Sequence, residues 1–342
     1  MITEKGVVYH SAFGLKDRER QLPFATNTIM NIGSVSKTVV GLALVKAVEA
    51  GHLSMDTPIN DVLPFSVNNP FFSDQPILIR HLANHTSGIR DSKHYGKTYV
   101  ADPDIERSGD IHTDFQGFLQ SHESLRLQDF LFRILNKKGQ WYKKKNFLRA
   151  APGTEADYAN LNAALAALAI EHASGKDFES FCQEKIFIPL KMKHTSWDGS
   201  SLNQTRLATP YFPAGKVVPP YRLNSWPDGG LYTSVEDLSL LLQEIIMAFQ
   251  GKSTFLSHPF AKQLLPGDDD GLRAFWGMGE KSRNIGHGGS DPGVQTDMQF
   301  NADRLLGRII FTNVNAEDNE ALWEQYRGIH RILAEYEMTV KD

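Results

Sequence analysis

The chain has 342 residues, and its 36 Lys and Arg against 40 Asp and Glu give a formal net charge of −4. This length allows one large domain or two ordinary ones, and the modest charge gives nucleic-acid binding little electrostatic support. Cys182 is the single cysteine, which excludes an internal disulfide. No stretch approaches 18 uncharged apolar residues, so we predict no transmembrane segment. The opening MITEKGVVYH has no apolar signal core, and the compartment and oligomeric state are left open.

The predicted elements begin with a strand and a buried helix. Residues 6–14, GVVYHSAFG, alternate in polarity and end on glycine, which predicts a strand. Residues 31–51 are apolar on nearly every side, which is typical of a core helix, and Gly51 is its expected C-terminal cap. A short helix is expected within PILIRHLANHTSG, residues 76–88.

Helices dominate the middle of the chain. Apolar residues recur at helical spacing in four stretches, 124–135, 158–175, 176–190 and 234–251. Gly175 is expected to end the second of these helices, and the third should end near Pro189. The fourth begins with a capping-box pattern, Ser234 followed by Asp237.

The C-terminal part returns to strands. Strand-like stretches occupy residues 272–279, 283–289, 294–300 and 305–314, and a final helix is expected over about 316–336. Strands first and last with helices between predict an α+β chain.

Two lobes follow from this order. We expect residues 1–50 together with 200–342 to form a lobe built on an antiparallel sheet flanked by helices. Residues 51–199 should form a mainly helical lobe, with the active site between the two. Residues 91–123 and 200–225 are rich in polar residues, Gly and Pro, and we expect long loops that shape the pocket.

A Ser-x-x-Lys element lies at the start of the buried helix. Ser34 and Lys37 are three residues apart, so in a helix their side chains share one face. A serine hydroxyl needs a base to become a nucleophile, and a buried lysine that has lost its charge can be that base. A lysine so early opposes the helix dipole, which favours a functional reason for it. The alternative is that Ser34 only caps the helix.

Two further clusters follow along the chain. Tyr158 and Asn160 stand where a Pro-Gly turn leads into an alanine-rich helix, so the phenol can relay a proton and the amide can hold a carbonyl or the lysine. The alternative is that the tyrosine packs and the asparagine caps. His287, Gly288 and Gly289 end a strand-like segment, and glycines there allow close approach of a ligand. The backbone N–H of Ser290 would then pair with that of Ser34 as an oxyanion hole; the alternative is a glycine-rich turn.

Ser-x-x-Lys, Tyr-x-Asn and His-Gly-Gly in this order resemble the serine β-lactamase and penicillin-binding protein superfamily. The similarity is to the branch with class C β-lactamases, DD-carboxypeptidases, D-aminopeptidases and related esterases. Other segments resemble that branch too, so the similarity covers nearly the whole chain. These segments are LANHTSGI, SGKDFESFCQEKIFIPLKMKHTSW, DGGLYTSVEDL and GHGGSDPGVQTDMQFNADRLLGRIIFTN.

The resemblance implies a β-lactamase/transpeptidase-like fold and an acyl-enzyme serine hydrolase of esters or amides, D-amino acid peptides included, without a cofactor. By position Ser34 would be the nucleophile, Lys37 its base or base partner, and Tyr158 the proton shuttle to and from the leaving group. Asn160 would support the site, and His287 would orient the substrate.

Two departures from the family pattern bear on function. His287 stands where many members carry a lysine, and a histidine that is mostly neutral at pH 7 attracts a substrate carboxylate less. This favours an esterase or aminopeptidase-like hydrolase over a dedicated β-lactamase or DD-carboxypeptidase. Only MITEKG precedes the segment at 6–14, where relatives usually have a helix and a full strand. Either the chain is truncated or the sheet has an unpaired edge.

Two rival readings have less support. A metal hydrolase would use His81 and His85, which are four residues apart, but no glutamate lies between them as in the zinc protease motif. A catalytically inactive binding or scaffold protein on this fold is the other rival, because fold does not decide function. The expected partner is a small-molecule or peptide substrate.

Overall fold

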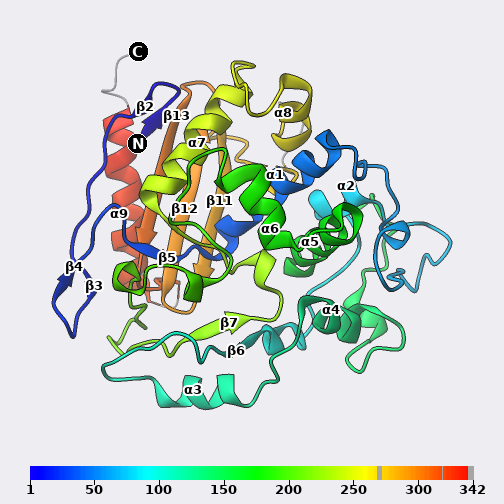
Figure 1. The fold of residues 1–342 in the computed structure, drawn as a ribbon, viewed down its shortest axis with the longest axis horizontal. Coiled ribbons are helices and arrows are strands. Elements are labelled where there is room, and N and C mark those ends of the chain that lie inside the picture. Colours follow the sequence, from blue (N-terminus) through cyan, green and yellow to red (C-terminus); the bar gives the residue numbers. More distant parts are fainter. Residues whose placement is uncertain (268–271, 318, 338–342) are drawn as a thin grey trace.

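An antiparallel sheet of seven strands forms the centre of the computed structural model, which describes residues 1–267, 272–317 and 319–337 (Figure 1). The strand order is β2-β1-β13-β12-β11-β10-β9, so strands from both ends of the chain meet in one sheet. The bounds are β1 Ile2–Thr3, β2 Gly6–Val7, β9 Leu272–Arg273, β10 Trp276–Met278, β11 Asn284–Asp291, β12 Val294–Asn301 and β13 Leu306–Thr312.

Helices cover both faces of this sheet (Figure 1). On β13, Ile310 packs with Tyr326 of α9, whereas its neighbours Ile309 and Phe311 pack on the main core, as the alternation of a strand requires. The main core joins side chains of the sheet with those of α1, α5 and α7, and α5 packs against α1. The helices are α1 Ser36–Glu49, α2 Ile79–Ala83, α3 Thr113–Gln120, α4 Leu127–Leu135, α5 Asn160–Ser174, α6 Phe178–Cys182, α7 Val235–Phe249, α8 His258–Leu264 and α9 Glu320–Glu337.

Three strand pairs lie outside the central sheet: β3 with β4, β5 with β8, and β6 with β7. Their bounds are β3 Leu15–Asp17, β4 Leu22–Pro23, β5 Ile29–Asn31, β6 Tyr99–Ala101, β7 Tyr221–Leu223 and β8 Tyr232–Ser234. Among the described residues, no helix is both long and apolar enough to span a membrane.

Most of the predicted helices are present where periodicity placed them, but the helix expected over 31–51 begins only at Ser36, because residue 31 belongs to β5 and residues 33–35 form a 3₁₀ turn. The residues from Ser36 to Val45 are all buried along α1, Lys37 included, so this helix is a core helix as expected. Gly175 ends α5 in a left-handed conformation with φ +69°. The Ser234 side chain accepts a hydrogen bond from the N–H of Asp237 and so caps α7.

Three expectations were wrong in part. The strand expected over 6–14 is limited to Gly6–Val7, because within the described residues no strand pairs with the backbone of 8–14. The side chains of Val8 and Phe13 are exposed. The expected helix over 176–190 is α6 followed by a π-helical turn, Gln183–Phe187. Neither expected loop is only loop, because 91–123 contains β6 and α3 and 200–225 contains β7. A small apolar cluster of Leu119 with three side chains of 218–223 holds the first of these segments in place.

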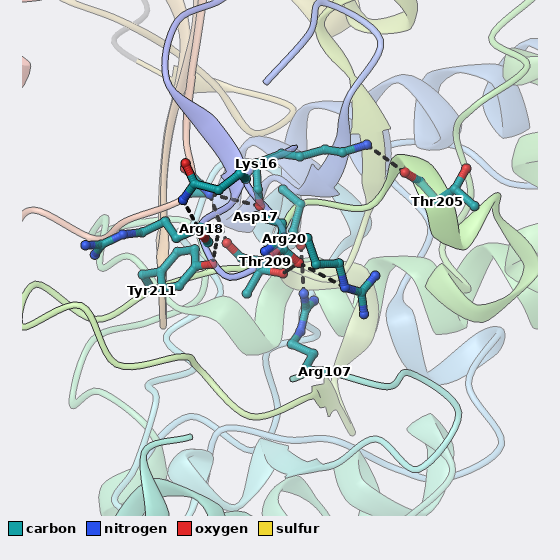
Figure 2. A network of polar contacts seen from close by, with 11 residues as sticks. Lys16, Asp17, Arg18, Arg20, Arg107, Thr205, Thr209 and Tyr211 are labelled. Atoms are coloured by element: carbon teal, nitrogen blue, oxygen red, sulfur yellow. Dashed lines mark hydrogen bonds and ion pairs between the residues drawn. The ribbon is translucent and has the colours of Figure 1, made fainter. Parts of the chain in front are cut away.

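The N-terminal hairpin of β3 and β4 is tied to the segment 205–211 (Figure 2). The N–H of Thr209 donates to the Lys16 carbonyl at 2.8 Å, and its hydroxyl donates to Asp17 Oδ2 at 3.1 Å. The N–H of Arg18 donates to the Tyr211 hydroxyl at 2.7 Å. These hydrogen bonds fix the segment that precedes β5, and β5 ends three residues before Ser34.

Candidate active site

Ser34 lies in a single turn of 3₁₀ helix, Gly33–Val35, between β5 and α1. Gly33 has φ +52°, a left-handed conformation that turns the chain sharply into the helix. The side chain of Asn31 holds this turn: its Oδ1 accepts from the N–H of Gly33 at 2.7 Å, and its Nδ2 donates to the Gly229 carbonyl at 2.9 Å. Ser34 is half-buried, and its N–H belongs to a helix start, where backbone donors lack intrahelical acceptors.

Lys37 points back at this serine. Its Nζ donates to Ser34 Oγ at 2.9 Å and to the carbonyl of Asp228 at 2.5 Å. The side chain has no exposed surface. The two hydrogen bonds therefore hold a fully buried amine against the hydroxyl, as expected from the three-residue spacing.

Tyr158 completes a group of three side chains. Its hydroxyl lies 3.2 Å from Ser34 Oγ and 3.3 Å from Asn160 Oδ1. Lys37 Nζ lies 5.3 Å from the centre of the tyrosine ring. Tyr158 is 48% exposed, so the group reaches solvent at this residue.

Asn160 is held by a residue that the sequence analysis did not identify. One carboxylate oxygen of Asp91 accepts from both the N–H and Nδ2 of Asn160, at 2.8 and 2.9 Å. The other oxygen accepts from the N–H of Leu161 at 3.2 Å. Asp91 therefore satisfies the exposed donors at the start of α5, where the helix dipole favours an anion. Burial raises the pKa of this carboxyl.

His85 lies beneath Tyr158. The two rings are 4.5 Å apart between centres, and His85 Nδ1 accepts from the N–H of Ala159 at 3.2 Å. Burial, with the nearby charge of Lys37 as a second cause, lowers the pKa of His85 to about 3, so the ring is neutral. From the sequence, His85 was named only as one of two possible metal ligands, although it belongs to the segment LANHTSGI, which resembles the family.

The strand β11 brings the predicted glycine motif against the serine turn. A Cβ added at Gly289 would lie 2.3 Å from the Ile32 carbonyl oxygen and 3.2 Å from the N–H nitrogen of Ser34. A Cβ at Gly33 would lie 3.0 Å from the nitrogen of Ser290. The backbones at Ser34 and Ser290 are therefore close neighbours.

His287 precedes these glycines on the same strand. Its ring centre lies 6.1 Å from that of Tyr158, and its Nδ1 lies 2.5 Å from the Gly288 carbonyl oxygen. Burial lowers the pKa of His287 to about 4, with Lys37 as a smaller cause. Gly288 is exposed, and Ser290 Oγ accepts from Asn315 Nδ2 at 2.8 Å.

Two buried carboxyl groups that were not predicted adjoin the site. The Tyr95 hydroxyl donates to Asp228 Oδ2 at 3.0 Å, and the Tyr99 hydroxyl donates to Asp291 Oδ1 at 2.7 Å. Burial raises the pKa of Asp228 and of Asp291 to about 7 each, although Lys37 opposes the shift in both. Both tyrosines come from the segment 91–123, which was expected to shape the pocket.

A cavity of about 260 Å³ is lined in part by Asn31, which holds the serine turn, but Ser34, Lys37 and Tyr158 are not among its lining residues. Residues of both predicted pocket segments line it. They include Asp102 and Asp104 from the first segment and Tyr221, Arg222 and Leu223 from the second.

Comparison with known proteins finds one family over nearly the whole chain. The family model described as Beta-lactamase matches residues 1–330. D-alanyl-D-alanine-carboxypeptidase/endopeptidase AmpH of Escherichia coli (strain K12) is 26% identical over 223 residues, which are 64% of this chain and 49% of that protein. The chain spans about half the length of the curated relatives it matches.

Solved structures share the fold. The octameric penicillin-binding protein homologue from Pyrococcus abyssi has a TM-score of 0.71 at 24% identity, over 91% of this chain and 68% of that one. D-amino acid amidase from Ochrobactrum anthropi SV3, complexed with L-phenylalanine amide, has a TM-score of 0.62 at 20% identity, over 88% of this chain and 81% of that one. At these identities the likeness concerns the fold alone.

Proposed function

Since the chain belongs to the Beta-lactamase family, we propose that it is a serine hydrolase that cleaves an ester or amide through an acyl-enzyme on Ser34. One observation carries the proposal. Ser34 Oγ lies 2.9 Å from Lys37 Nζ and 3.2 Å from the Tyr158 hydroxyl, so a nucleophile and two proton carriers are in mutual reach.

The reaction uses these three groups in turn. In the reacting form, with Lys37 as a free amine, Ser34 Oγ bonds to the substrate carbonyl carbon while its proton passes to Lys37 Nζ. The bond to the leaving group then breaks, the leaving group takes the proton of the Tyr158 hydroxyl, and Lys37 returns the proton it holds to the tyrosine oxygen. A water molecule then attacks the acyl-enzyme ester, one of its protons passes to Ser34 Oγ, and the acid leaves.

The developing oxyanion needs donors on the far side of the carbonyl. The N–H groups of Ser34 and Ser290 are the proposed pair, because Gly33 and Gly289 let the two backbones approach. Asn160, fixed by Asp91, supports Tyr158 through its side-chain oxygen. Gly288 and Gly289 have no side chains, so this part of β11 would not obstruct a substrate whose carbonyl lies beside it.

His287 bears on the substrate class. With a pKa of about 4 it is neutral at pH 7, so it offers a substrate carboxylate no full positive charge. This supports short esters and amides over β-lactams and peptides that end in a free carboxylate. β-Lactamase or DD-carboxypeptidase activity is the alternative within the same chemistry.

The test compares the parent with Ser34→Ala on p-nitrophenyl acetate and nitrocefin, together with labelling by a fluorophosphonate probe. We expect ester turnover well above that of nitrocefin, a label that maps to Ser34, and a loss of turnover of at least about a thousandfold in the variant. Ser73→Ala, at an exposed serine, is the control. Undiminished ester hydrolysis in Ser34→Ala would refute the nucleophile. A parent that neither turns over esters nor takes the label would favour an inactive binding protein.

A further inference from the structure

One oxygen of a buried carboxylate next to the site has no partner within the described residues. Asp291 is 7% exposed, and its Oδ1 accepts from the Tyr99 hydroxyl at 2.7 Å. Its Oδ2 accepts no hydrogen bond from the part of the chain that the structure describes, and the carboxylate has no ion-pair partner there. A buried carboxylate is costly unless it is paired.

The groups around Asp291 do not supply the missing partner. Lys37 is the cation whose charge acts on it, but the hydrogen bonds of that ammonium go to Ser34 and to the Asp228 carbonyl. Tyr99 already bonds the other oxygen, and Glu317 adds a further negative charge. A cation from outside the chain would balance the site.

Asp291 Oδ2 lies near the residues that are proposed to carry out the reaction. Asp291 directly follows Ser290, whose N–H is the proposed oxyanion donor. A Cβ placed on Gly229 would lie 3.4 Å from Asp291 Oδ2 and 3.8 Å from the carbonyl carbon of Gly33, the residue before the nucleophile. The unpartnered oxygen therefore lies near the backbone of the turn that carries the nucleophile. Because Gly229 has no side chain, no Cβ occupies the space between that oxygen and the turn.

We propose that Asp291 is a specificity-determining residue that binds a free ammonium group on the acyl part of the substrate. The substrate class is then α-amino acid amides or esters, or peptides with a free N-terminus, in which one carbon separates the ammonium from the reacting carbonyl. This inference rests on the proposed function of Ser34.

The test uses matched pairs of p-nitroanilides of one amino acid, with the amino group either free or acetylated, in both stereochemical series. At pH 8 the parent prefers the free amine. Asp291→Asn keeps the hydrogen-bond acceptor for Tyr99 but removes the charge, so kcat/KM for the free amine falls on the order of 30-fold or more, mainly through KM. The acetylated substrate changes by less than about threefold. Asp61→Asn, at an exposed carboxylate that is not among the residues lining the cavity, is the control.

The outcomes separate the two proposals. A parent that shows no preference for the free amine overturns the role of Asp291, whatever the variant does, so a variant that fails to fold does not prevent the test. Equal losses on both substrates in Asp291→Asn also overturn it, because they indicate a structural role. In either case the label on Ser34 still decides the proposed function independently.

Discussion

At the residue scale, Asp291 makes stability depend on pH. Its pKa in the fold, about 7, lies above its ordinary value of 3.8 because the carboxyl is buried. The unfolded chain therefore releases this proton first, and the parent loses stability as the pH rises from about 4 to 7. A binding residue that destabilises the empty protein in this way is a common cost of function.

Asp291→Asn should remove this loss of folding stability with rising pH. At pH 8 we expect the variant to be more stable than the parent by up to about 4 kcal/mol, since one pKa unit corresponds to about 1.4 kcal/mol. The difference should nearly disappear near pH 3, where the parent carboxyl is mostly neutral in both the folded and the unfolded state. Urea unfolding at pH 8, 6 and 3 measures it, with Asp61→Asn as the exposed control. A difference that stays constant with pH would contradict the assignment.

At the scale of elements, the site depends on how closely β11 approaches the serine turn. A Cβ on Gly289 would lie 2.4 Å from Thr296 Oγ1, which itself donates to the Ile32 carbonyl at 2.7 Å. The strand, its neighbour β12 and the turn before α1 thus form one hydrogen-bonded unit. The two proposed oxyanion donors belong to different elements, so this packing sets their separation.

Gly289→Ala should therefore push β11 away from the turn. We expect a loss of about 1–3 kcal/mol in the free energy of unfolding and a fall in kcat of about tenfold or more. Gly288→Ala is the matched control for stability, because a Cβ there would meet only the Thr296 carbonyl oxygen at 3.9 Å. Urea unfolding and ester kinetics measure both effects. If the two variants had the same free energy of unfolding, the close approach of β11 to the serine turn would not contribute to stability.

At the scale of the whole molecule, the two ends of the chain share one core. Ile2 on β1 pairs with Gly307 on β13 and is 1% exposed within the main apolar core. On the next strand Val7 is 47% exposed. The first residues are thus part of the sheet that carries the site.

Ile2→Ala should lower the free energy of unfolding by about 2–5 kcal/mol, the usual cost of truncating a buried isoleucine. Val7→Ala should change it by less than about 0.5 kcal/mol, because that side chain is exposed. Chemical unfolding followed by tryptophan fluorescence measures the pair. If both variants matched the parent, β1 would contribute nothing to the core.

The local sequence pattern alone was enough to predict many of the helices and strands. Helices α1, α5 and α7 follow from apolar spacing, from the glycine after α5 and from the serine before α7, all of which act within a few residues. The strands β11, β12 and β13 also lie where they were predicted. The strand over 6–14 was wrong beyond Val7, since pairing depends on a neighbouring strand and not on alternation alone. The division into two lobes stays a prediction.

The sequence by itself determined the family-like order of Ser34, Lys37, Tyr158 and His287, because each belongs to a short motif whose residue types and spacing are readable along the chain. Only the tertiary structure decided which polar groups surround them. Asp91, Asp228 and Asp291 acquire their partners across 69 to 192 residues of sequence, and their raised pKa values come from burial. Burial and long-range contact are properties of the packed chain, so no local pattern specifies them.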